Sequence, residues 1–210
     1  MNIGIIGSGN VGGTLGRRWA GNGHRVVFAS RDPGSEKTKK LVSEAGANAR
    51  AGKPSDAAAS SEVILIATPW DAAEPAVRAA GSLSGKVVID ATNPLLPGLA
   101  GLAVGCSDSA AERIAKAAAG ARVVKAFNTV GANIMSNPVF GGGKVAMFYC
   151  GDDAEAKMTV GGLIAELGFE PLDAGPLQQA RVLEPFATLW ISLAMRYGYG
   201  REIGFELLRR

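Results

Sequence analysis

The chain has 210 residues, of which 47% are hydrophobic and 20% charged, so it is long enough to bury the core of one large domain. Its net charge of +3 arises from 22 basic and 19 acidic residues spread along the sequence, without the basic stripe typical of nucleic-acid binders. Cys106 and Cys150 stand alone, which excludes a CxxC pattern. With no leader-like segment and no apolar run of membrane-spanning length, we expect a cytoplasmic protein without a metal site or a nucleic-acid or membrane partner.

Short aliphatic runs and alanine-rich segments alternate along the chain. The runs predict strands at residues 3–6, 25–29, 63–67, 87–90, 122–126, 145–150 and 169–172. Segments of helical length lie at residues 12–21, 36–45, 71–80 and 109–118. Strands that are apolar along their whole length and alternate with helices are buried on both faces. The pattern predicts an α/β protein of the Rossmann type, with a doubly wound, mainly parallel sheet.

A glycine-rich loop connects the first predicted strand to the first predicted helix. In it, Gly7 permits a tight turn, Gly9 lets the backbone approach a pyrophosphate, and Gly12 lets the helix pack close to the strand. Free amides at the start of a helix bind such an anion. We therefore predict a dinucleotide site in this loop, formed by Gly7, Ser8, Gly9, Asn10, Val11 and Gly12.

The end of the second strand indicates which dinucleotide binds. An acid there would bond the ribose 2′-hydroxyl, but this chain has Ser30 and Arg31, whose hydroxyl and guanidinium fit a 2′-phosphate. Lys37, one turn into the next helix, adds a second cation. Asp32 opposes this interpretation, because its carboxylate would take the hydroxyl-binding role if the strand ran longer. We predict NADP(H) as the cofactor, in preference to NAD.

Small and polar residues follow three further strands. The carboxyl ends of parallel strands at a switch in strand order border ligands in this fold. We therefore expect the nicotinamide and its reaction partner at these loops, although any single one of the residues is equally well explained as an ordinary turn. The candidates are Ala67, Thr68, Pro69, Trp70, Asn93, Asn128 and Ala132.

The last part of the chain predicts a long helix. Between residues 178 and 197, apolar residues recur at three- and four-residue spacing and form one apolar face. Such a face is typical of core packing or of a dimer surface. We divide the chain into a dinucleotide-binding domain, residues 1–177, and a short C-terminal helical extension, residues 178–210, which packs on that domain or on a second subunit of a homodimer.

The sequence offers no evident acid or base for carbonyl chemistry. No tyrosine is followed by lysine in a YxxxK pattern, and the single histidine, His24, falls in a predicted turn. Hydride transfer to a flavin-like ring mainly requires correct positioning and a dry pocket. We expect a small-molecule hydride acceptor and no catalytic residue. Two alternatives stay open: a non-catalytic NADP-binding redox sensor, and a small imine or keto-acid reductase acting across a dimer.

At this point the chain resembles the NADP-dependent deazaflavin oxidoreductases, whose fold is shared by the cytosolic domain of membrane ferric reductases. The resemblance implies that NADP lies along Gly7–Gly12, that Ser30, Arg31 and Lys37 hold the 2′-phosphate, and that Thr68, Pro69, Asn93 and Ala132 border the nicotinamide. It also implies hydride transfer to 8-hydroxy-5-deazaflavin or a flavin. The segments that carry it are residues 7–12, 30–31, 69–70, 125–129, 172–177, 180–181 and 183–184.

The chain departs from the deazaflavin-using members at Asn128. Those members can carry a histidine at this position, whereas the ferric-reductase-like relatives carry asparagine in the same Lys125-Ala-Phe-Asn-Thr129 context. An asparagine donates a hydrogen bond to a ring carbonyl but does not exchange a proton near neutral pH. The identity of the acceptor therefore stays open between a deazaflavin and a flavin.

Overall fold

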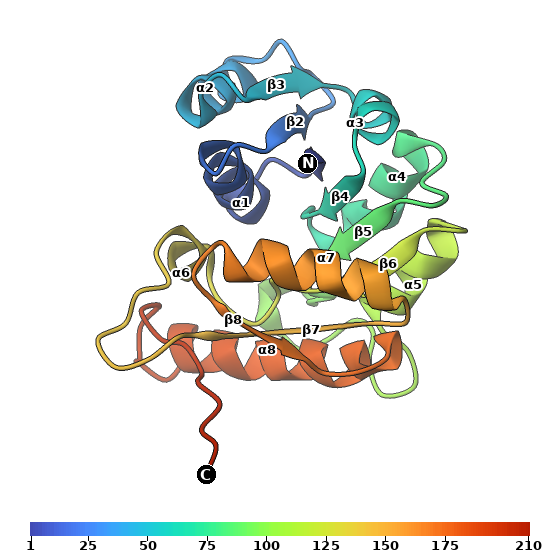
Figure 1. The fold of residues 1–210 in the computed structure, drawn as a ribbon. Coiled ribbons are helices and arrows are strands. Elements are labelled where there is room, and N and C mark those ends of the chain that lie inside the picture. The colour runs from blue at the N-terminus through green and yellow to red at the C-terminus, as the bar shows by residue number, and fades with distance from the viewer.

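The computed structural model describes all residues from 1 to 210 and contains one eight-stranded sheet in the order β3-β2-β1-β4-β5-β6-β7-β8 (Figure 1). All neighbouring strands run parallel except β6 and β7. The strands are β1 (Asn2–Ile6), β2 (Arg25–Ala29), β3 (Ala49–Gly52), β4 (Val63–Ile66), β5 (Val87–Asp90), β6 (Arg122–Lys125), β7 (Ala146–Gly151) and β8 (Glu170–Asp173).

Helices cover both faces of this sheet. They are α1 (Asn10–Gly21), α2 (Glu36–Ala45), α3 (Pro54–Ser60), α4 (Trp70–Ala80), α5 (Ala110–Ala117), α6 (Ala132–Ser136), α7 (Ala154–Ala165) and α8 (Ala180–Met195), with short 3-10 turns at Pro97–Leu99 and Leu177–Gln179. Because consecutive side chains of a strand point to opposite faces, Ile5 belongs to the buried cluster that includes residues of α1, α2, α6 and α7, whereas Ile6 belongs to the cluster that includes residues of α3, α4 and α5. The predicted doubly wound, mainly parallel α/β fold is confirmed.

The strand order places the glycine loop at the centre of the sheet. β1 pairs with β2 on one side and with β4 on the other, so the connections leave β1 and β4 in opposite directions. This is the topological switch point, where doubly wound proteins bind ligands outside the carboxyl ends of their strands. The loop between β1 and α1 lies at that point.

One strand, β3, and two short helices, α3 and α6, were not predicted from the sequence. β3 has the sequence Ala-Arg-Ala-Gly, which lacks the β-branched residues that identify a strand. It forms because its backbone pairs with β2 at the edge of the sheet. The seven-residue α3 follows at once, with Pro54 in its first turn and Asp56 accepting a hydrogen bond from the Lys53 amide.

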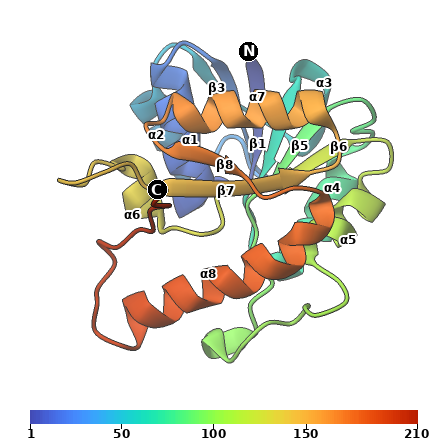
Figure 2. The same ribbon diagram turned by 60° about the horizontal axis from the view of Figure 1, so that its bottom comes forward.

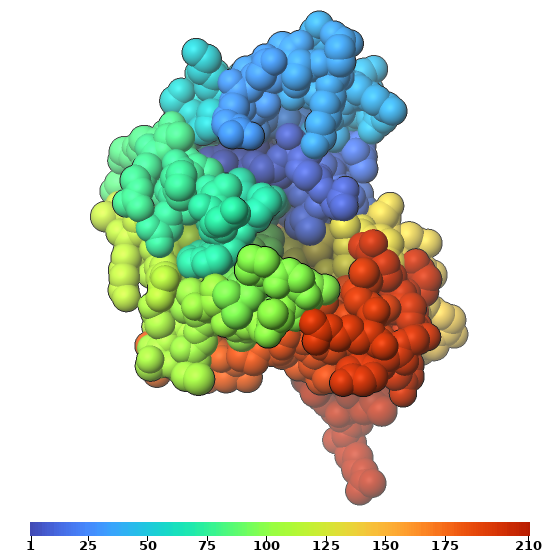
Figure 3. Space-filling model, turned by 180° about the vertical axis from the view of Figure 1, so that it is seen from behind, coloured from blue at the N-terminus to red at the C-terminus, as the bar shows by residue number.

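The C-terminal extension packs on the strands at the far edge of the sheet. In Figure 2, α7 and α8 lie on opposite sides of β7 and β8. The ring of Phe186 on α8 meets Phe148 of β7 at a centroid distance of 5.5 Å and Phe205 of the terminal segment at 4.6 Å. The Ala146 amide also donates to the Phe205 carbonyl. The last residues extend beyond the body of the molecule (Figure 3).

The helix predicted at residues 178–197 is confirmed with slightly narrower bounds, since α8 covers Ala180–Met195. Trp190 fixes the segment that follows by donating from Nε1 to the Ile203 carbonyl at 2.9 Å. The proposed domain division at residue 177 stays a prediction. None of the helices is both long enough and apolar enough to span a membrane.

Candidate functional site

The glycine loop is shaped by close contacts within the protein and by open space on one side. Gly7 has a φ of +104°, and a Cβ added there would lie 2.5 Å from the Ala67 carbonyl carbon. A Cβ on Gly12 would lie 2.0 Å from the Gly7 carbonyl oxygen. A Cβ on Gly9, in contrast, would meet nothing within 4 Å. The first two glycines are therefore required by the fold, whereas Gly9 leaves room for something outside the protein.

The helix that follows the loop presents free amides toward this space. α1 begins at Asn10, and its N-cap residue Gly9 supplies no side-chain hydrogen bond. No acidic residue lies in the first turn. Unpaired amides and the positive end of the helix dipole attract an anion, and the absence of a Cβ at Gly9 permits its close approach. The loop thus fits the pyrophosphate of a dinucleotide.

Two cations without carboxylate partners lie near the end of β2. Arg31 follows the strand and is exposed, and Lys37 is exposed in the first turn of α2; neither forms an ion pair. The Ser30 hydroxyl donates to the Asp32 carbonyl at 3.0 Å, and the Asp32 carboxylate accepts from the Gly34 amide. Asp32 therefore caps a turn beyond the strand. This geometry leaves the Arg31 and Lys37 cations available to a phosphate.

A row of buried oxygens without hydrogen-bond partners lies after β4, β5 and β6. These atoms are Thr68 Oγ1, Thr92 Oγ1 and Asn128 Oδ1. Buried polar atoms are nearly always paired, so such a row at the carboxyl ends of adjacent strands favours a ligand that carries N–H or O–H donors. The carboxamide of a nicotinamide ring has such donors. Thr92, unlike its two companions, was not among the predicted site residues.

Asn128 is held in place by its neighbours. Its side-chain Nδ2 donates to Asn93 Oδ1 at 3.2 Å and to the Leu183 carbonyl at 3.1 Å. The backbone carbonyl of Asn128 accepts from Asn93 Nδ2 at 3.0 Å. The preceding residue, Phe127, has a φ of +61°, which is uncommon for a side chain of this size. Its ring packs edge-on against Trp19. Backbone and hydrogen bonds together fix Asn128 next to Asn93.

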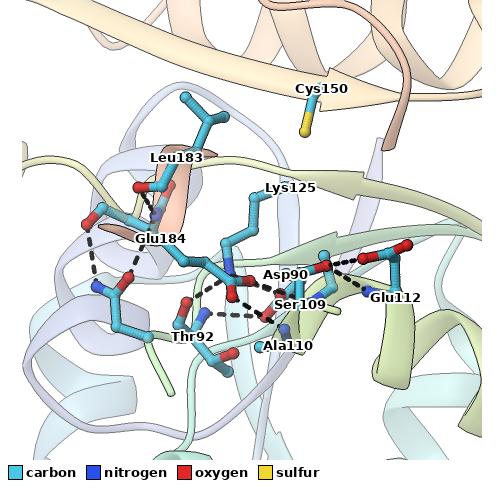
Figure 4. Close-up of polar contacts among 12 residues, drawn as sticks. Asp90, Thr92, Ser109, Ala110, Glu112, Lys125, Cys150, Leu183 and Glu184 are labelled. Atoms are coloured by element: carbon cyan, nitrogen blue, oxygen red, sulfur yellow. Dashed lines mark hydrogen bonds and ion pairs between the residues drawn. The ribbon is translucent and has the colours of Figure 1, made fainter. Parts of the chain in front are cut away.

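Beneath these loops lies a fully buried charged cluster, which we define as Asp90, Lys125 and Glu184 (Figure 4). Lys125 Nζ donates to Asp90 Oδ2 at 2.8 Å, to Glu184 Oε1 at 2.9 Å and to the Thr92 carbonyl at 2.6 Å. Glu184 also accepts from the amides of Ala110 and Ala111 at the start of α5.

Burial and charge act against each other on the pKa values of this cluster. Burial opposes the charge of Lys125, but the two facing carboxylates outweigh it and raise the pKa of the ammonium above its ordinary value. Burial raises the pKa of the Glu184 carboxyl, while Lys125 and the Ala110 amide oppose that shift. Burial also raises the pKa of the nearby Cys150 thiol to about 12, so this cysteine stays protonated and unreactive.

The charged cluster was not predicted from the sequence as part of a site. Asp90 and Lys125 each end an apolar strand, and they face each other in the pairing of β5 with β6. Glu184 lies in an otherwise apolar helix. An isolated charge at a position where the pattern demands an apolar residue is the signal that could have revealed them.

The predicted site residues fall into three neighbouring groups. Ser8, Gly9, Asn10, Lys37 and Ala132 line one cleft of about 580 Å³ between α1, α2 and α6. The second group is Ser30 and Arg31 at the end of β2. The third follows β4, β5 and β6 and lies outside the cleft: Ala67, Thr68, Pro69, Trp70, Asn93 and Asn128. Gly7, Val11 and Gly12 belong to the same loop and helix start but do not line the cleft.

Five further residues line the cleft and were not predicted from the sequence. They are Arg17, Lys40, Asn133, Arg201 and Glu202.

A doubly wound sheet with an uncapped helix and a glycine loop at its switch point defines a Rossmann-type nucleotide-binding protein. Residues 2–94 match the family described as NADP oxidoreductase, coenzyme F420-dependent. The chain is 32% identical to the F420-dependent NADP reductase of Methanothermobacter thermautotrophicus, over 93% of this chain and 90% of that protein. It therefore belongs to the family of F420-dependent NADP reductases.

Two further comparisons agree with this assignment. The crystal structure of a putative F420-dependent NADP reductase from Arthrobacter sp. FB24 superposes with a TM-score of 0.91 at 32% identity, covering 100% of both chains. The rat metalloreductase STEAP3 is 33% identical over 87% of this chain, which spans only 35% of that longer protein. The predicted resemblance to deazaflavin oxidoreductases and to ferric reductases is thereby confirmed.

Proposed function

We propose that this protein is an NADP(H)-dependent oxidoreductase that transfers hydride between the nicotinamide and a deazaflavin, with a flavin as the alternative acceptor. The observation that carries the proposal is the uncapped start of α1 next to Gly9, at the switch point of the sheet. The chain also matches the family described as NADP oxidoreductase, coenzyme F420-dependent. The names of the relatives favour a deazaflavin, because they specify coenzyme F420.

The residues would divide the work of holding the cofactor. The loop from Gly7 to Gly12 would bind the pyrophosphate through the amides of α1, and Ser30, Arg31 and Lys37 would hold the 2′-phosphate. The loops after β4, β5 and β6 would border the nicotinamide. Three buried oxygen atoms there, on Thr68, Thr92 and Asn128, have no hydrogen-bond partner within the protein. These loops comprise Ala67, Thr68, Pro69, Asn93 and Asn128; Trp70 and Ala132 begin the helices α4 and α6 that follow, and Ala132 also lines the cleft beside α1.

Catalysis would rest on positioning. Bound nicotinamide supplies the hydride chemistry, and the protein contributes orientation and exclusion of water. Asn128 has little freedom to move, since both protons of its side-chain amide are already donated. Its free Oδ1 can accept a hydrogen bond but cannot exchange a proton near neutral pH. We therefore assign no acid or base to any residue.

The function is tested by mixing purified protein with NADPH and following absorbance under anaerobic conditions. Reduction of 8-hydroxy-5-deazaflavin faster than of FMN or FAD supports the deazaflavin assignment. The reverse order assigns the protein to flavins. If none of the three acceptors is reduced above the rate without enzyme, the proposed function is wrong.

We further propose a cytoplasmic homodimer that associates through α8. Support comes from apolar side chains left exposed on or just after that helix, among them Val182, Leu189, Met195 and Tyr197. The free cysteines, one exposed and one buried, suit a reducing compartment. Light scattering decides the oligomeric state: a dimer mass that Leu189→Glu converts to a monomer supports the proposal, and a monomer for the unaltered chain contradicts it.

A further inference from the structure

The charged cluster of Asp90, Lys125 and Glu184 contains more negative than positive charge. Two carboxylates face one ammonium, and all three side chains are at most 1% exposed. Around the cluster, Arg181 pairs with Glu112, and Asp108 pairs with Arg113 and Lys116, but these groups are partly or largely exposed, so water screens their charges. One negative charge is therefore left over in a part of the molecule that water does not screen.

The hydrogen bonds favour the charged form of both carboxylates, against the burial that raises the pKa of Glu184. Glu184 receives N–H groups from Lys125, Ala110 and Ala111, so each of its oxygens acts only as an acceptor. Asp90 likewise accepts from Lys125 and from the Thr92 amide. A protonated carboxyl would turn a donor toward these donors. The amides at the start of α5 offset part of the negative charge of Glu184 but do not remove it.

The cluster lies directly beneath the loops that border the proposed nicotinamide site. Thr92, with its free hydroxyl oxygen, is bonded to the cluster through both its amide and its carbonyl. Leu183, next to Glu184, accepts from Asn128 Nδ2. Figure 4 shows the side chains of Lys125 and Glu184 converging next to Thr92. Cluster and loops form one connected network, so the excess charge lies close to whatever these loops hold.

We propose that the buried cluster of Asp90, Lys125 and Glu184 tunes the cofactor by favouring the oxidised nicotinamide, whose ring is positively charged, over the neutral reduced ring. This inference rests on the proposed function. Its physical basis is the attraction between the excess carboxylate charge and the oxidised ring through a medium of low dielectric constant. The phosphates and ribose groups are common to both forms, so cations elsewhere in the site do not discriminate between them.

The consequence is a direction for the reaction. Tighter binding of the oxidised cofactor lowers the reduction potential of the bound couple below that of the free couple. The protein would thereby make NADPH a stronger hydride donor toward the acceptor. Because the three side chains are fully buried beneath the loops, they would act without touching cofactor or acceptor, as positioning and tuning residues.

The first test measures the unaltered protein. Calorimetric titration gives the dissociation constants of NADPH and NADP⁺. The ratio of the NADPH constant to the NADP⁺ constant gives the shift in reduction potential. We expect NADP⁺ to bind more tightly than NADPH, with a ratio on the order of tenfold, equivalent to about 30 mV for a two-electron couple. A ratio below one overturns the inference without any variant.

The second test changes the charge balance. Glu184→Gln removes the excess negative charge and should lower the ratio about tenfold. Asp90→Asn removes the other carboxylate, leaves Lys125 paired with Glu184, and should lower the ratio by a similar factor. A purely structural role gives no reason for the two variants to shift the ratio in the same direction.

The matched control is Glu112→Gln, which also removes a carboxylate between α5 and α8 but one paired with Arg181 and partly exposed. It should leave the ratio unchanged. Equal losses of affinity for both cofactors in Glu184→Gln contradict charge tuning. If a variant fails to fold, as judged by circular dichroism, the ratio of the unaltered protein still decides. Absence of binding of both cofactors to the unaltered protein refutes the proposed function itself and is thus distinguishable.

Discussion

At the scale of single residues, the glycines of the loop do different jobs. Gly7 and Gly12 are enforced by the protein's own backbone, because a Cβ at either position would overlap neighbouring main-chain atoms. Gly9 has a φ of −77°, a value open to any residue, and lies against open space. The sequence pattern treats all three alike. Only the structure separates the glycines needed for folding from the one that is free for a ligand.

This difference predicts an unusual phenotype for Gly9→Ala. The variant should fold with unchanged or slightly higher stability, since replacing glycine where alanine fits stabilises by about 0.4 to 1 kcal/mol. Its affinity for NADPH should nevertheless fall at least about tenfold, because the new methyl group enters the space assigned to the pyrophosphate. Thermal unfolding and calorimetric titration test both parts. Unchanged affinity would place the pyrophosphate elsewhere.

A second prediction at this scale concerns cofactor choice. Arg31 is exposed and forms no ion pair, so Arg31→Ala should not affect folding. It should weaken NADPH binding by about 1.5 to 3 kcal/mol, the contribution of a charge-assisted hydrogen bond, and leave the weaker binding of NADH nearly unchanged. The measurement is a titration with each cofactor. Equal losses for NADPH and NADH would exclude Arg31 from the 2′-phosphate site.

At the scale of elements, helix starts follow the sequence closely. Ser109 caps α5 by accepting from the Glu112 amide, as its spacing from Glu112 predicts. The start of α7 offers two adjacent acids, Asp152 and Asp153, as caps. Asp153, and not Asp152, caps α7, while Asp152 accepts from the Leu177 amide. Local patterns thus locate a helix start well, but a tertiary contact decides between adjacent acids.

The contact between α5 and α8 should make stability depend on pH. Arg181 donates two hydrogen bonds to Glu112 and lowers the pKa of that carboxyl below its ordinary value of 4.5. Because the folded pKa is the lower one, the contact stabilises the protein above about pH 4.5, and this contribution is lost as the pH falls through the folded pKa.

Glu112→Gln should therefore lower the free energy of unfolding by about 1 kcal/mol near neutral pH and by progressively less in acid. Urea unfolding across this range is the measurement. Glu36→Gln is a suitable control, because Glu36 is highly exposed and pairs only with Lys39. A loss that stayed constant down to about pH 3 would show that the ion pair is not its cause.

At the scale of the whole molecule, cofactor binding should stabilise the fold. The proposed site joins the β1 loop, the end of β2 and the ends of β4, β5 and β6, so a bound dinucleotide would connect much of the sheet. At about a hundredfold excess over its dissociation constant, NADPH should add about 2.7 kcal/mol, which raises the melting temperature of a chain this long by roughly 5 to 11 °C. NADH at the same concentration is the control. An unchanged melting temperature would argue against specific binding.

Much of this architecture follows from the sequence. The alternation of aliphatic runs with helical segments predicts the doubly wound sheet, because strands buried on both faces require it. The glycine loop follows from its place between strand and helix. β3 could not be predicted, since it is defined by pairing with β2 and not by its own composition.

The sequence by itself determined the order of the main elements, the location of the glycine loop and the absence of an acid at the end of β2, since these are local patterns. Only the tertiary structure decided which distant residues meet. Lys125 bonds Asp90, 35 residues earlier, and Glu184, 59 residues later. The physical reason is that strand register and helix packing, which no local period encodes, set these contacts. The charge beneath the proposed nicotinamide site therefore emerges only in the folded molecule.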